Sequence, residues 1–93
     1  MKKSTPDIDF MMKFVKDFID KKKDRLDLDC DFNYHLMQRY AKMCRENEHV
    51  AEAFVYYISD VFDKSDNMSD SELRRKMNHG YKQVLDMLSG NIY

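Results

Sequence analysis

The chain has 93 residues, of which 35% are charged and 43% hydrophobic, and its formal net charge is -1. This length is that of one domain, and an aromatic content of 13% excludes a disordered chain. The near-neutral charge argues against a protein that mainly coats nucleic acid, because such a protein carries a basic stripe.

Glycine and proline are scarce, with two glycines and one proline in the whole sequence. Hairpins and tight turns depend on these residues, whereas the interior of a helix needs neither. We therefore predict an all-α fold, a compact bundle of about four antiparallel helices in which residues 1–93 form a single domain.

The sequence shows no pattern typical of export or of membrane insertion. Two cysteines are too few for a disulfide framework, and no apolar stretch approaches the roughly 18 residues of a membrane span. The basic start runs directly into Asp7 and Asp9, without the apolar segment of a signal peptide. We expect a cytoplasmic protein.

The first helix is predicted over residues 6–23, with Thr5 as N-cap and Pro6 in the first turn. Its apolar arc covers roughly 200°, more than one core contact requires. Phe10 and Phe14 stand to one side of the stripe that faces the core. Either both flanks of this helix are buried, or these rings form an exposed surface. The polar side mixes lysines with aspartates, so no attraction to an anionic membrane is expected.

The exposed alternative predicts a partner-binding surface on this helix. Phe10 and Phe14 would be its aromatic anchors, with Tyr56 beside them if the third helix packs alongside. Lys13 and Asp17 would form the polar rim. The partner would be another protein or a second copy, giving a homodimer through the first helix.

Residues 24–31 alternate acidic and apolar side chains, and we predict an extended connector with Leu26 and Leu28 turned inward. A second helix is expected over residues 31–45. Asp29 or Asp31 would be its N-cap. One broad face of this helix carries the apolar side chains Phe32, Leu36, Met37, Tyr40, Ala41, Met43 and Cys44.

Asn47 is a suitable N-cap for a third helix over residues 48–63. Neither glycine nor proline enforces a break before it, so one long helix over about 32–63 is the alternative.

The last helix is predicted over residues 70–89. Ser69 and Glu72 have the spacing of a capping box, in which each satisfies the other's main-chain amide. Gly80 falls inside the apolar period, and the helix is expected to continue through it and to end at Gly90.

A nucleic-acid-binding role through residues 69–89 is the alternative function. Arg74, Arg75 and Lys76 could contact phosphates there, although the same helix begins with two acidic residues.

Cys30 with His35 and Cys44 with His49 repeat the pattern Cys-x-x-Asn-x-His, and two Cys and two His side chains are a possible ligand set for zinc. These pairs lack the turn that usually separates zinc ligands, so we expect no metal. No spacing indicates a nucleophile beside a base, and neither catalysis, a cofactor nor a small-molecule substrate is expected.

No motif in the sequence identifies a function. The surplus of apolar and methionine side chains favours a small non-catalytic intracellular protein that binds another protein or itself. The glycine-poor composition, rich in Lys, Asp, Asn and Tyr, is typical of regulatory or accessory proteins of phage or mobile-element origin.

Overall fold

The computed structural model describes residues 4–90, which contain helices and no strand. The elements in chain order are α1 (Pro6–Ile19), α2 (Arg25–Glu46), α3 (Glu48–Phe54), the π-helix η1 (Val55–Ser59), α4 (Asp60–Asp63), the 3-10 turn η2 (Ser65–Asn67) and α5 (Asp70–Leu88). Because α3, η1 and α4 follow one another without interruption, they form one helical rod. The fold is therefore built from four helical units.

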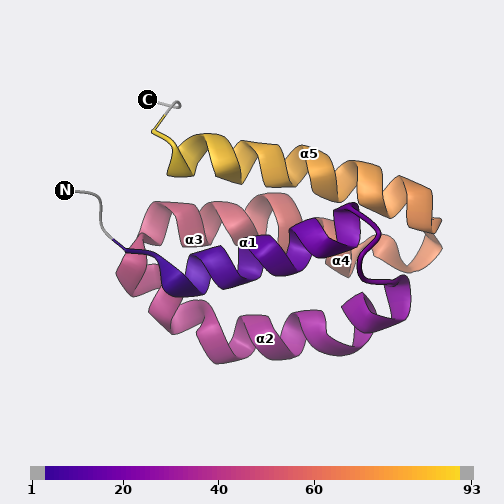
Figure 1. Ribbon diagram of the computed structural model, residues 1–93, viewed down its shortest axis with the longest axis horizontal. Coiled ribbons are helices and arrows are strands. Elements are labelled where there is room, and N and C mark those ends of the chain that lie inside the picture. Colours follow the sequence, from indigo (N-terminus) through magenta and orange to yellow (C-terminus); the bar gives the residue numbers. More distant parts are fainter. Residues whose placement is uncertain (1–3, 91–93) are drawn as a thin grey trace.

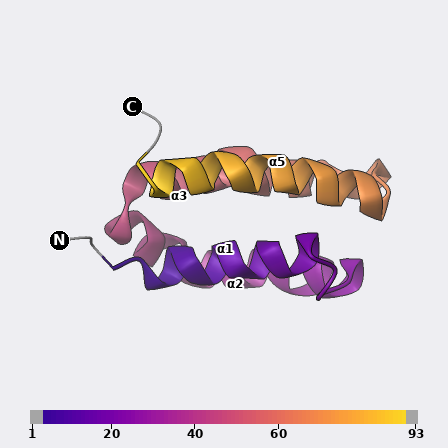
Figure 2. The ribbon, with the colours of Figure 1, turned by 45° about the horizontal axis from the view of Figure 1, so that its top comes forward.

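These units run alternately up and down, so sequence neighbours are antiparallel (Figure 1). α1 packs against α2 and α5, and the rod formed by α3, η1 and α4 also packs against α2 and α5. Figure 2 shows the result as two layers, with α1 and α2 in one and α3 and α5 in the other. The predicted all-α bundle of four antiparallel helices is confirmed.

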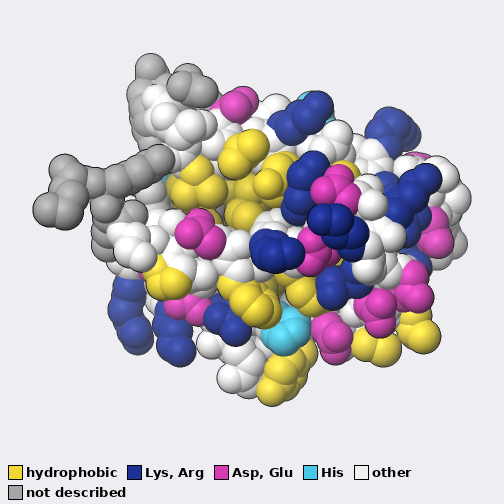
Figure 3. Space-filling model, in the orientation of Figure 1, with side chains coloured by type: hydrophobic (Ala, Val, Ile, Leu, Met, Phe, Trp, Pro, Cys, Tyr) yellow, Lys and Arg dark blue, Asp and Glu magenta, His cyan; other side chains and the backbone are white. Residues whose placement is uncertain are grey.

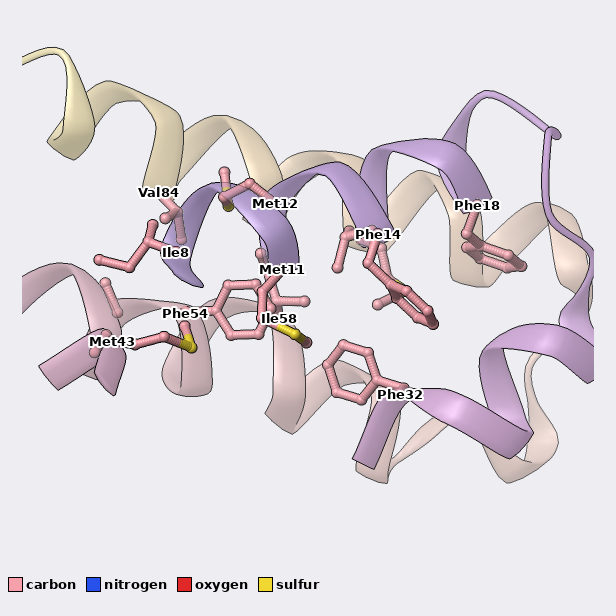
Figure 4. Packing of buried hydrophobic residues seen from close by; sticks show 14 of the residues in the cluster. Ile8, Met11, Met12, Phe14, Phe18, Phe32, Met43, Phe54, Ile58 and Val84 are labelled. Atoms are coloured by element: carbon pink, nitrogen blue, oxygen red, sulfur yellow. The ribbon is translucent and has the colours of Figure 1, made fainter. Parts of the chain in front are cut away.

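The core is a single cluster of apolar side chains contributed by all four units. Phe32 of α2 lies near its middle, stacked on Phe54 with ring centroids 6.1 Å apart and tilted against Phe62 at 4.7 Å. Phe14 of α1 reaches the same ring at 6.4 Å (Figure 4). Aromatic contacts of this kind add about 0.5–1.5 kcal/mol each beyond the burial of their area.

The start of α1 is capped from a distant part of the chain. Thr5 occupies the N-cap position, but its side chain makes no cap hydrogen bond, and Pro6 has no N–H to satisfy. Instead, the Glu46 carboxylate accepts hydrogen bonds from the amides of Asp7 at 2.8 Å and Ile8 at 2.9 Å. The last residue of α2 therefore closes the first turn of α1.

α1 ends at Ile19, earlier than the predicted residue 23. Lys21 adopts a left-handed conformation with φ 65°, and its amide donates to the carbonyl of Phe18 at 3.1 Å. The amide of Lys22 donates to the carbonyl of Asp17 at 2.8 Å. This pair of bonds is a Schellman motif, which stops a helix, here with lysine where glycine is usual.

The predicted extended connector is wrong, because α2 already begins at Arg25. Asp24 is its N-cap and accepts from the amide of Asp27 at 2.9 Å. The Arg25 guanidinium also donates to the carbonyls of Ser65 at 2.9 Å and Met68 at 3.1 Å, which fixes this turn against the segment before α5.

Asp29 and Asp31 consequently lie inside α2 and cap nothing, contrary to the prediction. The prediction that both leucines face inward is confirmed for Leu28, which is fully buried, and is wrong for Leu26, which is 69% exposed. In a helix two such residues lie about 200° apart, so only one of them can face the core.

α2 and α3 are separate helices. Asn47 between them has extended backbone angles, and its side chain accepts from the amide of Val50 at 3.2 Å, as an N-cap does. At α5, the Ser69 hydroxyl accepts from the amide of Glu72 at 3.1 Å. α5 runs through Gly80, and Gly90 follows it with φ 76°.

Candidate functional site

The aromatic side of α1 is partly buried in the structure. Phe14 is only 7% exposed and lies against the ring of His35 at 5.2 Å. Phe10 is half-buried, because the Arg39 guanidinium covers its ring at 3.6 Å and His35 meets its edge at 5.2 Å. Phe14 therefore belongs to the core, whereas part of the Phe10 ring remains accessible.

Arg39 also forms an ion pair with Asp7, with Nη1 and Oδ1 2.8 Å apart. Burial acts to raise the pKa of Asp7, but hydrogen bonding with Glu46 and Arg39 and the positive charge of Lys42 outweigh it. The pKa of Asp7 therefore lies below its usual 3.8. This polar cluster joins the start of α1 to α2 and closes the edge where Phe10 would otherwise be open.

Of the other residues of the predicted surface, Lys13 and Asp17 line a hollow of about 280 Å³ together with these rings, and Tyr56 does not. Lys13 and Asp17 pair with each other at 3.2 Å on the polar side of α1. Tyr56 is 71% exposed on η1, in the opposite layer of the bundle. The predicted surface is therefore reduced to the accessible part of Phe10 with Lys13 and Asp17, and Tyr56 does not belong to it.

An exposed apolar face lies on α2. We call it the outer face of α2, and it comprises Leu26, Cys30, Tyr34, Met37 and Ala41, all of them exposed. Their spacings of four, four, three and four residues place them within an arc of about 80° on the helix. Met37 is 82% and Tyr34 61% exposed. In Figure 3, hydrophobic side chains show along the lower edge of the molecule, where α2 lies.

Sequence reasoning missed this face because α2 carries apolar residues on two sides. The sequence pattern places Met37 and Ala41 on the same broad face as Phe32 and Met43, but the structure buries only Phe32 and Met43. The signal was present in the spacing: Cys30, Tyr34, Met37 and Ala41 repeat at the alternating intervals of a heptad.

Charge is divided unevenly along α2. Asp27, Asp29 and Asp31 lie in its first half, whereas Lys42 and Arg45 lie in its last two turns. All five side chains belong to exposed residues. The first half of α2 therefore has an excess of negative charge, although Arg25 pairs with Asp29 there at 3.5 Å, and the second half has an excess of positive charge.

A second distinctive region lies where η1 meets α5. Here the rod widens into a π-helix over Val55–Ser59. Gly80 of α5 faces this segment so closely that a Cβ on it would lie 2.9 Å from the carbonyl carbon of Tyr57 and 3.2 Å from Cγ1 of Ile58. π-helical turns inside α-helices are rare and are frequently found at functional sites.

Beside this contact runs an open groove of about 840 Å³ between η1 and α4 on one side and α5 on the other. Its floor and walls include two tyrosines and a row of basic and histidine side chains from α5: Tyr56, Tyr57, Arg75, Lys76, His79 and Lys82. Lys64 and Asp60 at the end of the rod complete it and pair with each other at 3.0 Å.

The three residues predicted for nucleic-acid binding, Arg74, Arg75 and Lys76, do not lie on the same surface of α5. Arg75 and Lys76 line the groove. Arg74 is turned toward α1, where its Nε donates to the carbonyl of Phe18 at 2.9 Å and its guanidinium lies 4.5 Å from the Phe18 ring. Arg74 thus joins α5 to α1 and is not available to a ligand in the groove.

The cysteines and histidines of the zinc alternative are also dispersed. His35 lies among the rings of Phe10, Phe14 and Tyr34, and Cys30 is exposed on the outer face of α2. Within residues 4–90, no group of three or more His, Cys, Asp or Glu side chains is placed to hold a metal ion.

Neither a family model, nor a curated protein, nor a solved structure matches this chain. None of the helices in residues 4–90 combines the length and the apolar character needed to span a membrane.

Proposed function

We propose that this chain is a small, non-catalytic protein-binding module that self-associates through the outer face of α2. The observation that carries the proposal is the run of exposed apolar side chains along one face of α2, four of which have heptad spacing. Met37, Tyr34 and Leu26 are each more than 60% exposed, although each is large and apolar. A contiguous apolar face on one helix is typical of an interaction surface, and Tyr and Met are enriched in interface cores.

The heptad spacing favours another helix as the partner. Side chains at alternating intervals of four and three residues form a seam along an α-helix, and two such seams pack as knobs into holes. From Cys30 to Ala41 the heptad-spaced part of the outer face extends about 16 Å, which is about one and a half such repeats.

The charge distribution favours an antiparallel second copy. Two parallel α2 helices would bring the three aspartates of one copy against those of the other. Antiparallel α2 helices place the acidic first half of each copy against Lys42 and Arg45 of the other, and they oppose the helix dipoles. The interface is then isologous, as in most homodimers.

In the antiparallel register that matches the heptads, the two-fold axis passes between Tyr34 and Met37. Tyr34 of one copy then lies opposite Met37 of the other, and Cys30 lies opposite Ala41. The α1, α3 and α5 surfaces remain outside this contact, because α2 presents only its outer face.

Size-exclusion chromatography with light scattering tests the proposal. The wild-type chain is expected to have about twice the 11.3 kDa mass of one chain, and Met37→Glu is expected to reduce it to a monomer. Leu85→Glu introduces the same charge on the exposed side of α5 and should leave the dimer intact. A monomeric wild type, or a Met37→Glu variant that remains dimeric and folded, contradicts the proposal.

A further inference from the structure

We infer that the groove between η1 and α5 binds single-stranded nucleic acid, with bases on the tyrosines and phosphates on the basic row of α5. This site lies on a different surface from the outer face of α2 and does not depend on self-association. Three observations carry the inference: the shape of the groove, the charges that line it, and the exposure of its aromatic rings.

Two locally unfavourable features meet beside the groove, a π-helical turn and a glycine inside a helix. A π-helical turn at Val55–Ser59 has poorer backbone geometry than an α-helix, and Gly80 inside α5 costs about 1 kcal/mol relative to alanine. At this point the two backbones approach closely, at Gly80 and Tyr57. The space left between them, about 840 Å³, is within the usual range of ligand pockets.

The lining has an excess of positive charge that the rest of the chain does not share. Four of its side chains are basic and one is acidic, in a chain whose net charge is -1. Lys64 is paired with Asp60 at 3.0 Å, and Lys76 with Glu72 at 3.4 Å.

Two of these basic residues have no ion-pair partner within residues 4–90 and can therefore pair with a ligand. Within residues 4–90, the side chains of Arg75 and Lys82 take part in no ion pair or hydrogen bond. Both are exposed. They lie seven residues apart, or two turns of α5, so they are about 10.5 Å apart along the helix axis. At this separation the two residues can contact two phosphates of one extended strand.

The aromatic rings give the groove its stacking surface. Tyr56 is 71% exposed and meets Tyr57 edge to face, with centroids 4.9 Å apart and an angle of 83°. Because Tyr56 is exposed, its ring contributes little to the core. Its contact with the Tyr57 ring fixes its orientation, so that a base can stack on it. Base stacking on such a ring is worth about 1–3 kcal/mol per base and tolerates any sequence.

These features select the single strand over the duplex. Stacking on Tyr56 requires an unpaired base, and α5 lies along the groove wall with Arg74 tied to Phe18, so it cannot enter a major groove as a recognition helix does. An acidic peptide would satisfy the charges but would leave the tyrosines without a planar partner.

Fluorescence anisotropy with a labelled oligothymidylate of about 12 nucleotides tests the site. Raising the salt from about 50 to about 200 mM should weaken binding about sevenfold if two phosphates are contacted, and roughly 50-fold if four are. Arg75→Ala with Lys82→Ala should weaken binding by about fivefold or more at low salt. The charge-matched control, Lys13→Ala with Lys22→Ala, removes two exposed lysines outside the groove and should change it less than about twofold.

The tyrosine contribution is tested separately. Tyr56→Phe keeps the ring and should bind as the wild type does, whereas Tyr56→Ala should bind at least about fivefold more weakly. An abasic strand with the same number of phosphates should also bind more weakly. Equal binding of the abasic strand, of a duplex or of polyglutamate, or no binding at low salt, overturns the inference.

Discussion

The backbone of Gly80 lies directly against the main-chain carbonyl of Tyr57. A Cβ on Gly80 would lie 2.9 Å from the carbonyl carbon of Tyr57 and still closer to its oxygen, so no side chain fits there. The residue is buried in the middle of α5, where helix propensity alone would favour alanine. Close approach of the two helices therefore explains the glycine, and it occurs at the π-helical segment that forms one wall of the groove.

Gly80→Ala is expected to destabilise the fold by about 1–3 kcal/mol, because the obstructing atoms belong to the backbone and cannot rotate away. Chemical denaturation monitored by circular dichroism measures the effect. Asp86→Ala, at an exposed position of the same helix, is the control and should change stability by less than about 0.5 kcal/mol. A Gly80→Ala variant more stable than the wild type would show that the approach is looser than described.

Glu46→Ala is expected to destabilise the chain by about 1–2 kcal/mol, since the amides of Asp7 and Ile8 lose their acceptor. Glu46→Gln retains one carbonyl oxygen and should fall between the wild type and the alanine variant. Glu52→Ala removes an exposed carboxylate of α3 and serves as the control. If Glu46→Ala and Glu52→Ala unfold at the same denaturant concentration, Glu46 does not cap α1.

Lys21→Gly is expected to stabilise the chain by about 0.5–1 kcal/mol. Lysine pays a steric cost at φ 65° that glycine avoids, and this gain exceeds the greater flexibility of glycine in the unfolded chain. Lys22→Gly, one residue later and without a positive φ, should instead be neutral or destabilising. Thermal unfolding of the two variants gives opposite shifts if the Schellman motif is present, and shifts of the same sign would argue against it.

The lowered pKa of Asp7 predicts an acid-dependent loss of stability. Burial alone would raise this pKa, but the hydrogen bonds with Glu46 and Arg39 and the charge of Lys42 lower it below 3.8. The ionised carboxylate therefore contributes stability above pH 3.8, and this contribution is lost as the pH falls through the lower pKa of the folded state.

Asp7→Asn should be less stable than the wild type at neutral pH, and the difference should shrink as the pH is lowered below 3.8. Denaturation midpoints measured over that range check this. Asp86→Asn, which changes an exposed aspartate of α5, is the control. A difference between Asp7→Asn and the wild type that stays constant with pH would rule out the ionised pair with Arg39.

The sequence predicts elements well where their ends are fixed locally. Ser69 and Asn47 cap α5 and α3 through amides three residues away, and both helices begin where these residues place them. The boundary between α1 and α2 was misplaced for the opposite reason. Its turn depends on a left-handed lysine and on Arg25 bonds to carbonyls 40 and 43 residues away, neither of which leaves a local pattern.

The candidate surfaces were predicted only in part, for related reasons. Tyr56, Arg75 and Lys76 were singled out, but only the fold brings these three residues into one groove. The π-helical turn has no sequence signature that could have predicted it. On α2, apolar residues occupy two sides of the helix, so the choice of the buried side depends on the tertiary packing of Phe32 and Met43.

The pairing of two α2 helices is tested most directly by oxidative cross-linking of designed cysteine variants. In the antiparallel dimer Cys30 of one copy faces residue 41 of the other, so Ala41→Cys in a Cys44→Ser background should form a covalent dimer under mild oxidation. Cys44→Ser alone, which leaves only Cys30, should stay uncross-linked. Cross-linking of Cys44→Ser through Cys30 alone, or of neither variant, would contradict the account.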